Sequence, residues 1–214
     1  MQKDWRSIRA VLAQTFKAVW QELWTALVVN SLWMLANLLI IPGPPATIAL
    51  SWYTNQLAHE EAVDHTDYWR AIGRFFKIGW RWGILNLLIV AFLVGDYWIT
   101  YQSQDFGGKK LLLGLYVALL IFWLLMQFFA LPFLFEQKES KVLQAQNNAL
   151  VLISLNLHFA ILLGLVITLI LFLGTLLFLL SVFFGPFFLG LASNFAVMDR
   201  LENAQPNPIP SEGS

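Results

Sequence analysis

The chain has 214 residues, of which 58% are hydrophobic and only 12% are charged. Soluble domains carry roughly 25% charged residues, so this composition excludes an ordinary water-soluble domain. The net charge of zero gives no general attraction to nucleic acid, and a sequence without cysteine has no disulfide, thiolate nucleophile or cysteine-ligated metal.

Long apolar stretches then define the class. About 20 apolar residues cross a bilayer core, and residues 23–41, 82–101, 111–135 and 149–198 all qualify, the last being long enough for two crossings. We therefore predict an all-α fold, a polytopic helical membrane protein with a single transmembrane domain over residues 1–200. Its expected location is the plasma (inner) membrane.

The first element, residues 5–22, is predicted to be an amphipathic helix. Trp5, Ile8, Leu12, Phe16 and Val19 recur at helical spacing. Such a helix lies in the headgroup region of the membrane. Because its apolar residues are spaced rather than continuous, the segment is not expected to be a cleavable signal.

The next stretch raises the question of whether the chain turns inside the membrane. An apolar helix over 23–41 meets Pro42, Gly43, Pro44 and Pro45, and apolar residues 46–62 follow. Lys and Arg near membrane spans favour the cytoplasmic side. If 46–62 returns, only Lys109 and Lys110 of the thirteen Lys and Arg residues lie outside; if it does not, the two sides are nearly equal. The count predicts a return, with both termini in the cytoplasm.

Residues 68–81 are predicted to form an interfacial helix. Arg70, Arg74, Lys77 and Arg81 step by four, three and four residues and so share one helical face. That face is expected to meet anionic lipid. The alternative is that it docks a cytoplasmic partner.

Two further hairpins complete the plan of about six spans in three hairpins, each with a cytoplasmic amphipathic lead-in. Spans over 82–101 and 111–135 form the second, and spans over 149–183 and 186–199 form the third. The last turn is placed at Gly174 or at Gly185–Pro186, and the second position is favoured. Residues 201–214 are polar and rich in proline, which predicts a disordered tail.

The two Gly-Pro turns are the candidate binding site. A helix that starts at a proline inside the membrane leaves N–H groups free, and transporters use such broken helices to hold polar ligands. The alternative is that neighbouring carbonyls satisfy these groups. The candidate binding and turn residues are Gly43, Pro44, Thr47, Ser51, Gly185, Pro186 and Ser193.

A polar cluster is the second candidate. Asn30, Asn86 and Asn156 each lie in the first helix of a hairpin, and His158 is close to the last of them. Amides in hydrocarbon need partners, so these side chains are expected either to join helices or to line a cavity.

No catalytic motif was found. There is no G-x-x-x-x-G-K-[ST], H-E-x-x-H or G-x-S-x-G. The His spacing in "HEEAVDH" (59–65) does not place both rings on one face of a continuous helix, so no metal site is predicted. We predict no enzymatic activity and no cofactor.

Three segments carry a family resemblance: "NSLWMLANLLIIPGPPATIALSWY" (30–53), "YWRAIGRFFKIGWRWGILN" (68–86) and "FFGPFFLGLASNF" (183–195). In these segments the chain resembles the YesL-like family of bacterial integral membrane proteins. Members often come from sugar-utilisation settings beside ABC-type sugar uptake systems. The resemblance implies a role near carbohydrate transport, and it carries over no catalytic residues.

Two functions are therefore expected. The first is a non-enzymatic accessory or interaction subunit, embedded in the lipid bilayer and associated with sugar transport, with ABC-type transporter subunits as partners. The alternative is a small membrane carrier or channel whose site lies at the helices started by the Gly-Pro turns. The sequence predicts no nucleic-acid partner and does not indicate an oligomeric state.

Overall fold

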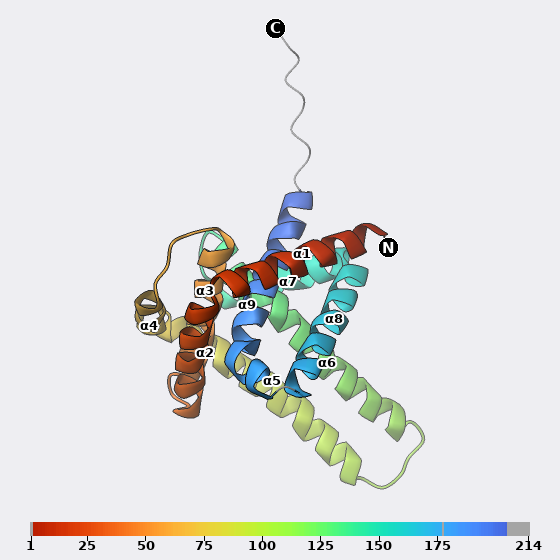
Figure 1. Ribbon diagram of the computed structural model, residues 1–214. Coiled ribbons are helices and arrows are strands. Elements are labelled where there is room, and N and C mark those ends of the chain that lie inside the picture. The colour runs from red at the N-terminus through yellow and green to blue at the C-terminus, as the bar shows by residue number, and fades with distance from the viewer. Residues whose placement is uncertain (1, 177, 205–214) are drawn as a thin grey trace.

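Figure 1 shows the computed structural model of the chain, which describes residues 2–176 and 178–204. These residues form nine helices and no strand, which confirms the all-helical prediction for the described part of the chain. The helices are α1 (Gln2–Gln21), α2 (Leu23–Leu38), α3 (Gly43–Ala58), α4 (His65–Arg74), α5 (Phe76–Gln102), α6 (Lys109–Glu136), α7 (Val142–Leu155), α8 (Leu157–Leu176) and α9 (Phe178–Ala204).

Neighbouring helices pair into three hairpins. Figure 1 places the α2–α3 turn, the tip of the α5–α6 hairpin and the adjoining ends of α8 and α9 towards the bottom of the view. Helix α1, the link between α3 and α4, and the C-terminal end of α9 lie towards the top. The paired helices α2–α3, α5–α6 and α8–α9 therefore adjoin at the same end of the molecule.

Some of the helices are long and apolar enough to cross a membrane. Among the described residues, α5 and α6 are each long and apolar enough to cross a membrane, and α7 with α8 reaches that standard as one pair bent by 103°. Helix α2 is apolar but shorter. Two or three described helical segments thus have the length and composition of membrane spans, as in a helical membrane protein.

Helix α3 is the centre of the core. Most of its residues are buried, and it packs against α2, α4, α5, α6 and α9. Its first turn fits against α5 because two glycines of α5 leave room for prolines. A Cβ added at Gly79 would lie 2.6 Å from Pro45 N, and one added at Gly83 would lie 2.8 Å from Pro44 Cβ.

Helix α4 packs against α3, and buried side chains hold the two helices together. Asp64 caps its N-terminus, and the Asp67 carboxylate accepts from the Asp64 N–H at 3.0 Å. Tyr68 is fully buried, and its hydroxyl donates to the Ala46 carbonyl at 3.2 Å. Burial raises the pKa of Tyr68, which keeps this hydroxyl a donor.

The predicted interfacial helix over 68–81 is wrong in one respect, because the chain breaks at Phe75 between α4 and α5. The Phe75 ring is buried and lies 5.4 Å from the ring of Phe135 and 6.0 Å from that of Trp52. The break lets α4 cover α3 while α5 leaves in another direction, bringing Gly79 against the first turn of α3.

The third hairpin differs most from the prediction. The expected helix over 149–183 is broken at Asn156, where α7 and α8 meet at a large angle. Gly185 and Pro186 do not form a turn, because both lie inside α9, and Gly174 lies inside α8. Helix α9 continues to Ala204, past the expected start of the tail at 201, and residues 205–214 lie outside the described residues.

Candidate functional site

A cavity of about 320 Å³ lies between α2, α3, α6 and α9, and we call it the central cavity. It brings together four of the predicted binding residues, two from α3 and two from α9. Its lining residues are Trp33, Thr47, Leu50, Ser51, Leu124, Gln127, Phe128, Leu131, Pro186, Leu189, Gly190 and Ser193.

Most hydroxyls of the central cavity are already bonded within the chain. Trp33 Nε1 donates to Thr47 Oγ1 at 3.1 Å, and Thr47 Oγ1 lies at the same distance from the Gly43 carbonyl, to which it donates. Ser193 Oγ donates to the Gly190 carbonyl at 2.8 Å. Ser51 differs, because it is 4% exposed and its Oγ has no hydrogen-bond partner among the described residues. Ser51 is therefore the cavity-lining residue whose buried hydroxyl has hydrogen-bonding capacity left.

The Gly-Pro turns themselves are not open sites. Gly43 is buried, and a Cβ added there would lie 3.0 Å from Asn37 Oδ1. The prolines that follow pack on α5, and the Ala46 N–H already donates to the Pro42 carbonyl at 2.8 Å. Because Gly185 and Pro186 lie within a continuous helix, no helix starts at them. The ligand-accessible feature is thus the cavity beside α3 rather than the helix starts.

A buried polar network joins α3, α6 and α9 at the other end of α3. Asn55 Nδ2 donates to Glu136 Oε1 at 2.7 Å and to Asn194 Oδ1 at 3.0 Å. Asn194 Nδ2 donates to Thr54 Oγ1 at 3.1 Å, and His59 Nε2 lies 2.7 Å from Glu136 Oε1. Sequence reasoning did not single out Glu136. The sequence feature that could have indicated it is an acidic residue at the end of an apolar helix, where its carboxylate can accept hydrogen bonds from amides on neighbouring helices.

A second network joins α5, α6 and α7 and contains Asn86. Trp123 Nε1 donates to Asn86 Oδ1 at 3.0 Å, and Trp82 Nε1 donates to Gln127 Oε1 at 2.9 Å. Gln127 and Gln146 exchange two hydrogen bonds of 3.0 Å. Gln127 also lines the central cavity, so this network holds one of its walls.

Asn156 belongs to a third group, at the break between α7 and α8. Asn156 Oδ1 accepts from Arg200 Nη1 at 3.5 Å, and the Arg200 guanidinium lies 3.6 Å from the centre of the Phe159 ring. Arg200 is 8% exposed, with Asp199 Oδ2 3.3 Å from its Nε and Asp4 Oδ1 3.8 Å from its Nη1. A cation at the carboxyl end of α7 is favoured by the helix dipole.

The predicted polar cluster is therefore divided. Asn86 and Asn156 bond to different residues, Asn30 is buried on α2, and His158 is exposed. Two asparagines thus join helices in separate places. The four residues do not surround one cavity.

The predicted docking or lipid-facing residues are all on the surface. Arg70 and Arg74 are exposed on α4, and Lys77 and Arg81 are exposed on α5. Trp69, next to Arg70 on α4, is 62% exposed. Exposed basic residues therefore lie on both sides of the break at Phe75.

The central cavity offers binding rather than acid–base chemistry. None of the described residues that line it is His, Lys, Asp or Glu, so within that part of the chain Ser51 has no base beside it to activate it as a nucleophile. His59 and His65 contact Glu136 and Asp64. Among the described residues, no group of three His, Asp or Glu side chains is placed to hold a metal ion.

Comparisons of the chain with protein-family models, with curated proteins and with solved structures found no match. The resemblance to the YesL-like family therefore stays a prediction.

Proposed function

We propose that this chain is a non-enzymatic integral membrane protein that works as an interaction subunit for another membrane protein. Six spans in three hairpins, with both termini in the cytoplasm, form the proposed topology. Its support is the common direction of the three hairpins in Figure 1 together with the charge count. Lys109 and Lys110 lie at the end where the hairpins turn, and the other basic residues belong to segments expected at the opposite side.

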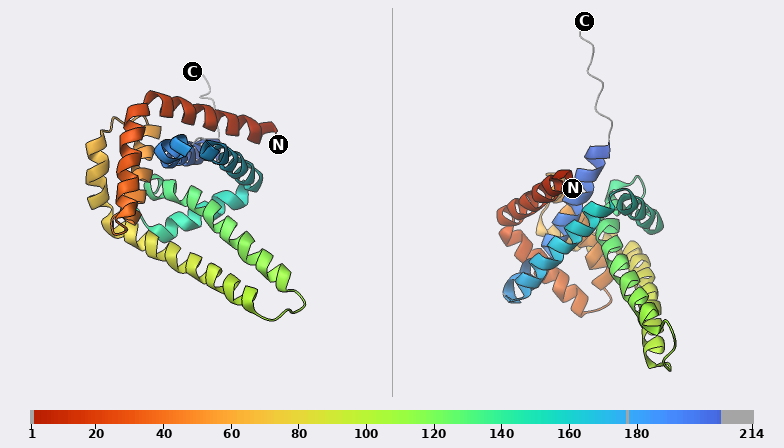
Figure 2. Two further views of the ribbon diagram at one scale, coloured as in Figure 1. Left: turned by 60° about the horizontal axis from the view of Figure 1, so that its bottom comes forward. Right: turned by 90° about the vertical axis from the view of Figure 1, so that its right-hand side faces the viewer.

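The observation that carries the proposal is the α5–α6 hairpin. Both views of Figure 2 show its far part extending beyond the other helices. In the most apolar window of each helix, only 6% of the residues in α5 and 11% in α6 are buried. Much of the hairpin therefore has no packing partner within the described chain, and its surface is free for lipid or another protein.

Small residues on this hairpin favour a protein neighbour. Ala91 and Gly95 are four residues apart on α5, and Gly114 and Ala118 are four apart on α6. No described atom outside the local helix lies within 4 Å of a Cβ added at Gly95 or Gly114. Because small residues at this spacing let helix backbones approach closely, they mark helix–helix contacts in membranes. The family resemblance makes a membrane subunit of a sugar uptake system the partner to test.

The test is a pull-down of the tagged full chain in gentle detergent, read by mass spectrometry against an untagged control. A stoichiometric membrane partner is expected. A variant carrying Gly95→Leu and Gly114→Leu should lose it, because both surfaces become bulky. Ile99→Leu with Ile121→Leu is the matched control, since these residues are 68% and 62% exposed on the same helices. Recovery of the chain alone, or equal recovery of a partner with the glycine variant, would contradict the proposal.

A carrier for a small solute is the second candidate, favoured by Ser51 in the wall of the central cavity, whose hydroxyl has no partner within the described part of the chain. Thermal-shift screening of sugars and polyols should then find compounds that stabilise the wild-type chain. Ser51→Leu puts a bulky apolar side chain in the wall of the cavity and removes the hydroxyl, so the stabilisation should disappear. If no compound distinguishes the two proteins, the carrier assignment fails.

A further inference from the structure

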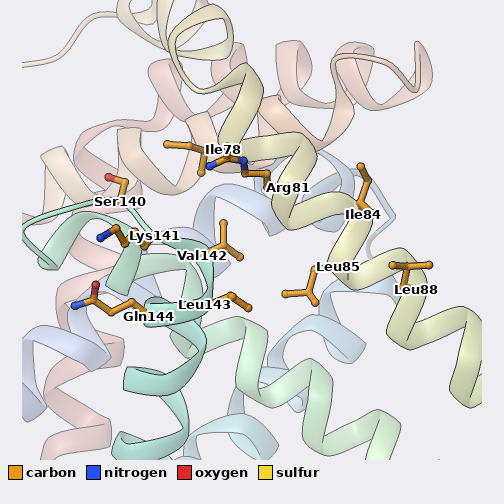
Figure 3. Close-up of a pocket in the computed structure, with 10 residues that line it drawn as sticks. All are labelled: Ile78, Arg81, Ile84, Leu85, Leu88, Ser140, Lys141, Val142, Leu143 and Gln144. Carbon is orange, nitrogen blue, oxygen red and sulfur yellow. The ribbon is translucent and has the colours of Figure 1, made fainter.

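A second cavity, of about 610 Å³, lies between α5 and the start of α7 (Figure 3). We call it the α5–α7 cavity. Its polar lining comes from Arg81 on α5 and from Ser140, Lys141 and Gln144 around the start of α7. Its apolar lining includes Ile84 and Leu85, and Figure 3 shows Leu85 on the side facing α7.

The charge in this cavity is of one sign. Both ionisable residues in its lining, Arg81 and Lys141, are basic. Lys141 Nζ lies 2.6 Å from Glu139 Oε2, but both side chains are about two-thirds exposed, at 66% and 68%. An exposed pair of this kind is weak, so Lys141 can exchange it for another anion.

The start of α7 adds hydrogen-bond donors to the charge. Helix α7 begins at Val142, and Lys141 at its N-cap makes no side-chain capping hydrogen bond. The first N–H groups of a helix have no helical acceptor, and the helix dipole favours an anion there. With two basic side chains and the Ser140 hydroxyl beside them, these donors suit the oxygens of a phosphate group.

The apolar wall identifies the kind of phosphate. Ile84, Leu85 and Leu88 follow one another along α5, which is apolar enough to cross a membrane. An inorganic phosphate ion would gain no favourable contact from this apolar wall. The acyl chains of a lipid would pack against it. Basic pockets between membrane helices on the cytoplasmic side suit anionic headgroups.

We infer that the α5–α7 cavity is a binding site for an anionic phospholipid of the cytoplasmic leaflet. The phosphate lies between Arg81, Lys141 and the start of α7, and the acyl chains run along α5. This inference uses the proposed topology but not the proposed partner, so it stands or falls separately from the interaction subunit.

Native mass spectrometry of the delipidated full chain in detergent tests the site. The probes are dioleoyl phosphatidylglycerol and dioleoyl phosphatidylcholine, which share acyl chains and differ in net charge. The phosphatidylglycerol is expected to bind more tightly. Arg81→Gln and Lys141→Gln should each weaken that binding about fivefold, or about 1 kcal/mol per basic residue. Ser140→Glu, which places a carboxylate beside the phosphate position, should remove the preference.

Two matched controls separate this site from diffuse surface charge. Lys110→Gln removes an exposed base from α6, and Lys138→Gln removes one from the link that holds Lys141. Neither residue lines the cavity, so both variants should bind like the wild type. The inference is overturned if these controls weaken binding as much as Arg81→Gln does. It is also overturned if phosphatidylcholine binds equally well, or if millimolar inorganic phosphate displaces the lipid.

Discussion

Replacing Gly79 by alanine should destabilise the fold through one added methyl group. The new Cβ would lie 2.6 Å from Pro45 N and 3.0 Å from the Pro44 carbonyl carbon. Both are backbone atoms at the start of α3, so no flexible side chain can move aside. The contact must be relieved by shifting α5 away from α3, which opens the packing around the turn.

The magnitude follows from two opposing effects. Alanine in place of glycine inside a helix stabilises by about 1 kcal/mol. Overpacking a filled site costs about 1–3 kcal/mol, and a backbone clash belongs at or above the upper end. We therefore expect Gly79→Ala to lower the free energy of unfolding by about 2 kcal/mol. A Cβ added at Gly95 on the same helix has no described atom outside the local helix within 4 Å, so Gly95→Ala should raise the free energy of unfolding by up to about 1 kcal/mol.

The assay is thermal unfolding of both variants in the same detergent, followed by gel filtration with fluorescence detection. At about 2–4 °C per kcal/mol for a chain of this length, the two melting temperatures should differ by several degrees in opposite directions from the wild type. If Gly79→Ala melts at or above the wild-type temperature, the close packing of α5 on the Pro-Gly turn is refuted.

Three further substitutions test the buried polar groups, each by the free energy of unfolding in detergent. Arg200→Leu should cost about 2–3 kcal/mol, because it leaves two partly buried carboxylates without their cation; a neutral result would show that Arg200 does not hold the α7–α8 break. Asn194→Leu should cost about 1–3 kcal/mol, because the donor to Thr54 and the acceptor from Asn55 are both lost. Ser51→Ala should cost nothing measurable, because its Oγ has no partner to lose; a loss above about 1 kcal/mol would mean that the hydroxyl is bonded after all.

Much of the helical pattern could be predicted because it depends on local sequence. The predicted segments 5–22, 111–135 and 46–62 correspond to α1, α6 and α3 with shifts of a few residues at their ends. Apolar length and helical spacing determine such segments without help from distant residues. Arg70, Arg74, Lys77 and Arg81 are exposed as charged residues are expected to be, but the single helical face predicted for them is divided at Phe75 between α4 and α5.

The helix breaks could not be predicted because they depend on distant residues. The break at Asn156 contacts Arg200, and the break at Phe75 packs on Phe135. The helix through Pro186 is the opposite case, since a proline that ordinarily interrupts a helix lies inside α9. A single sequence gives no record of these tertiary contacts.

The candidate site was predicted in part. Thr47, Ser51, Pro186 and Ser193 do line one cavity, although the reason given, two helices starting at Gly-Pro turns, holds only at α3. Gln127 also lines that cavity and is hydrogen-bonded to Gln146 on α7, a contact between helices that the sequence alone does not reveal. The α5–α7 cavity needs α7 to start beside α5, which no local pattern indicates.

The proposed topology of three hairpins is tested most directly by thiol labelling. The chain has no cysteine, so single substitutions give a clean background. Ala62, between α3 and α4, and Ser103, between α5 and α6, are both exposed. With a membrane-impermeant thiol reagent on intact cells, Ser103→Cys should react and Ala62→Cys should react only after permeabilisation. Labelling of both positions from the same side would contradict the topology.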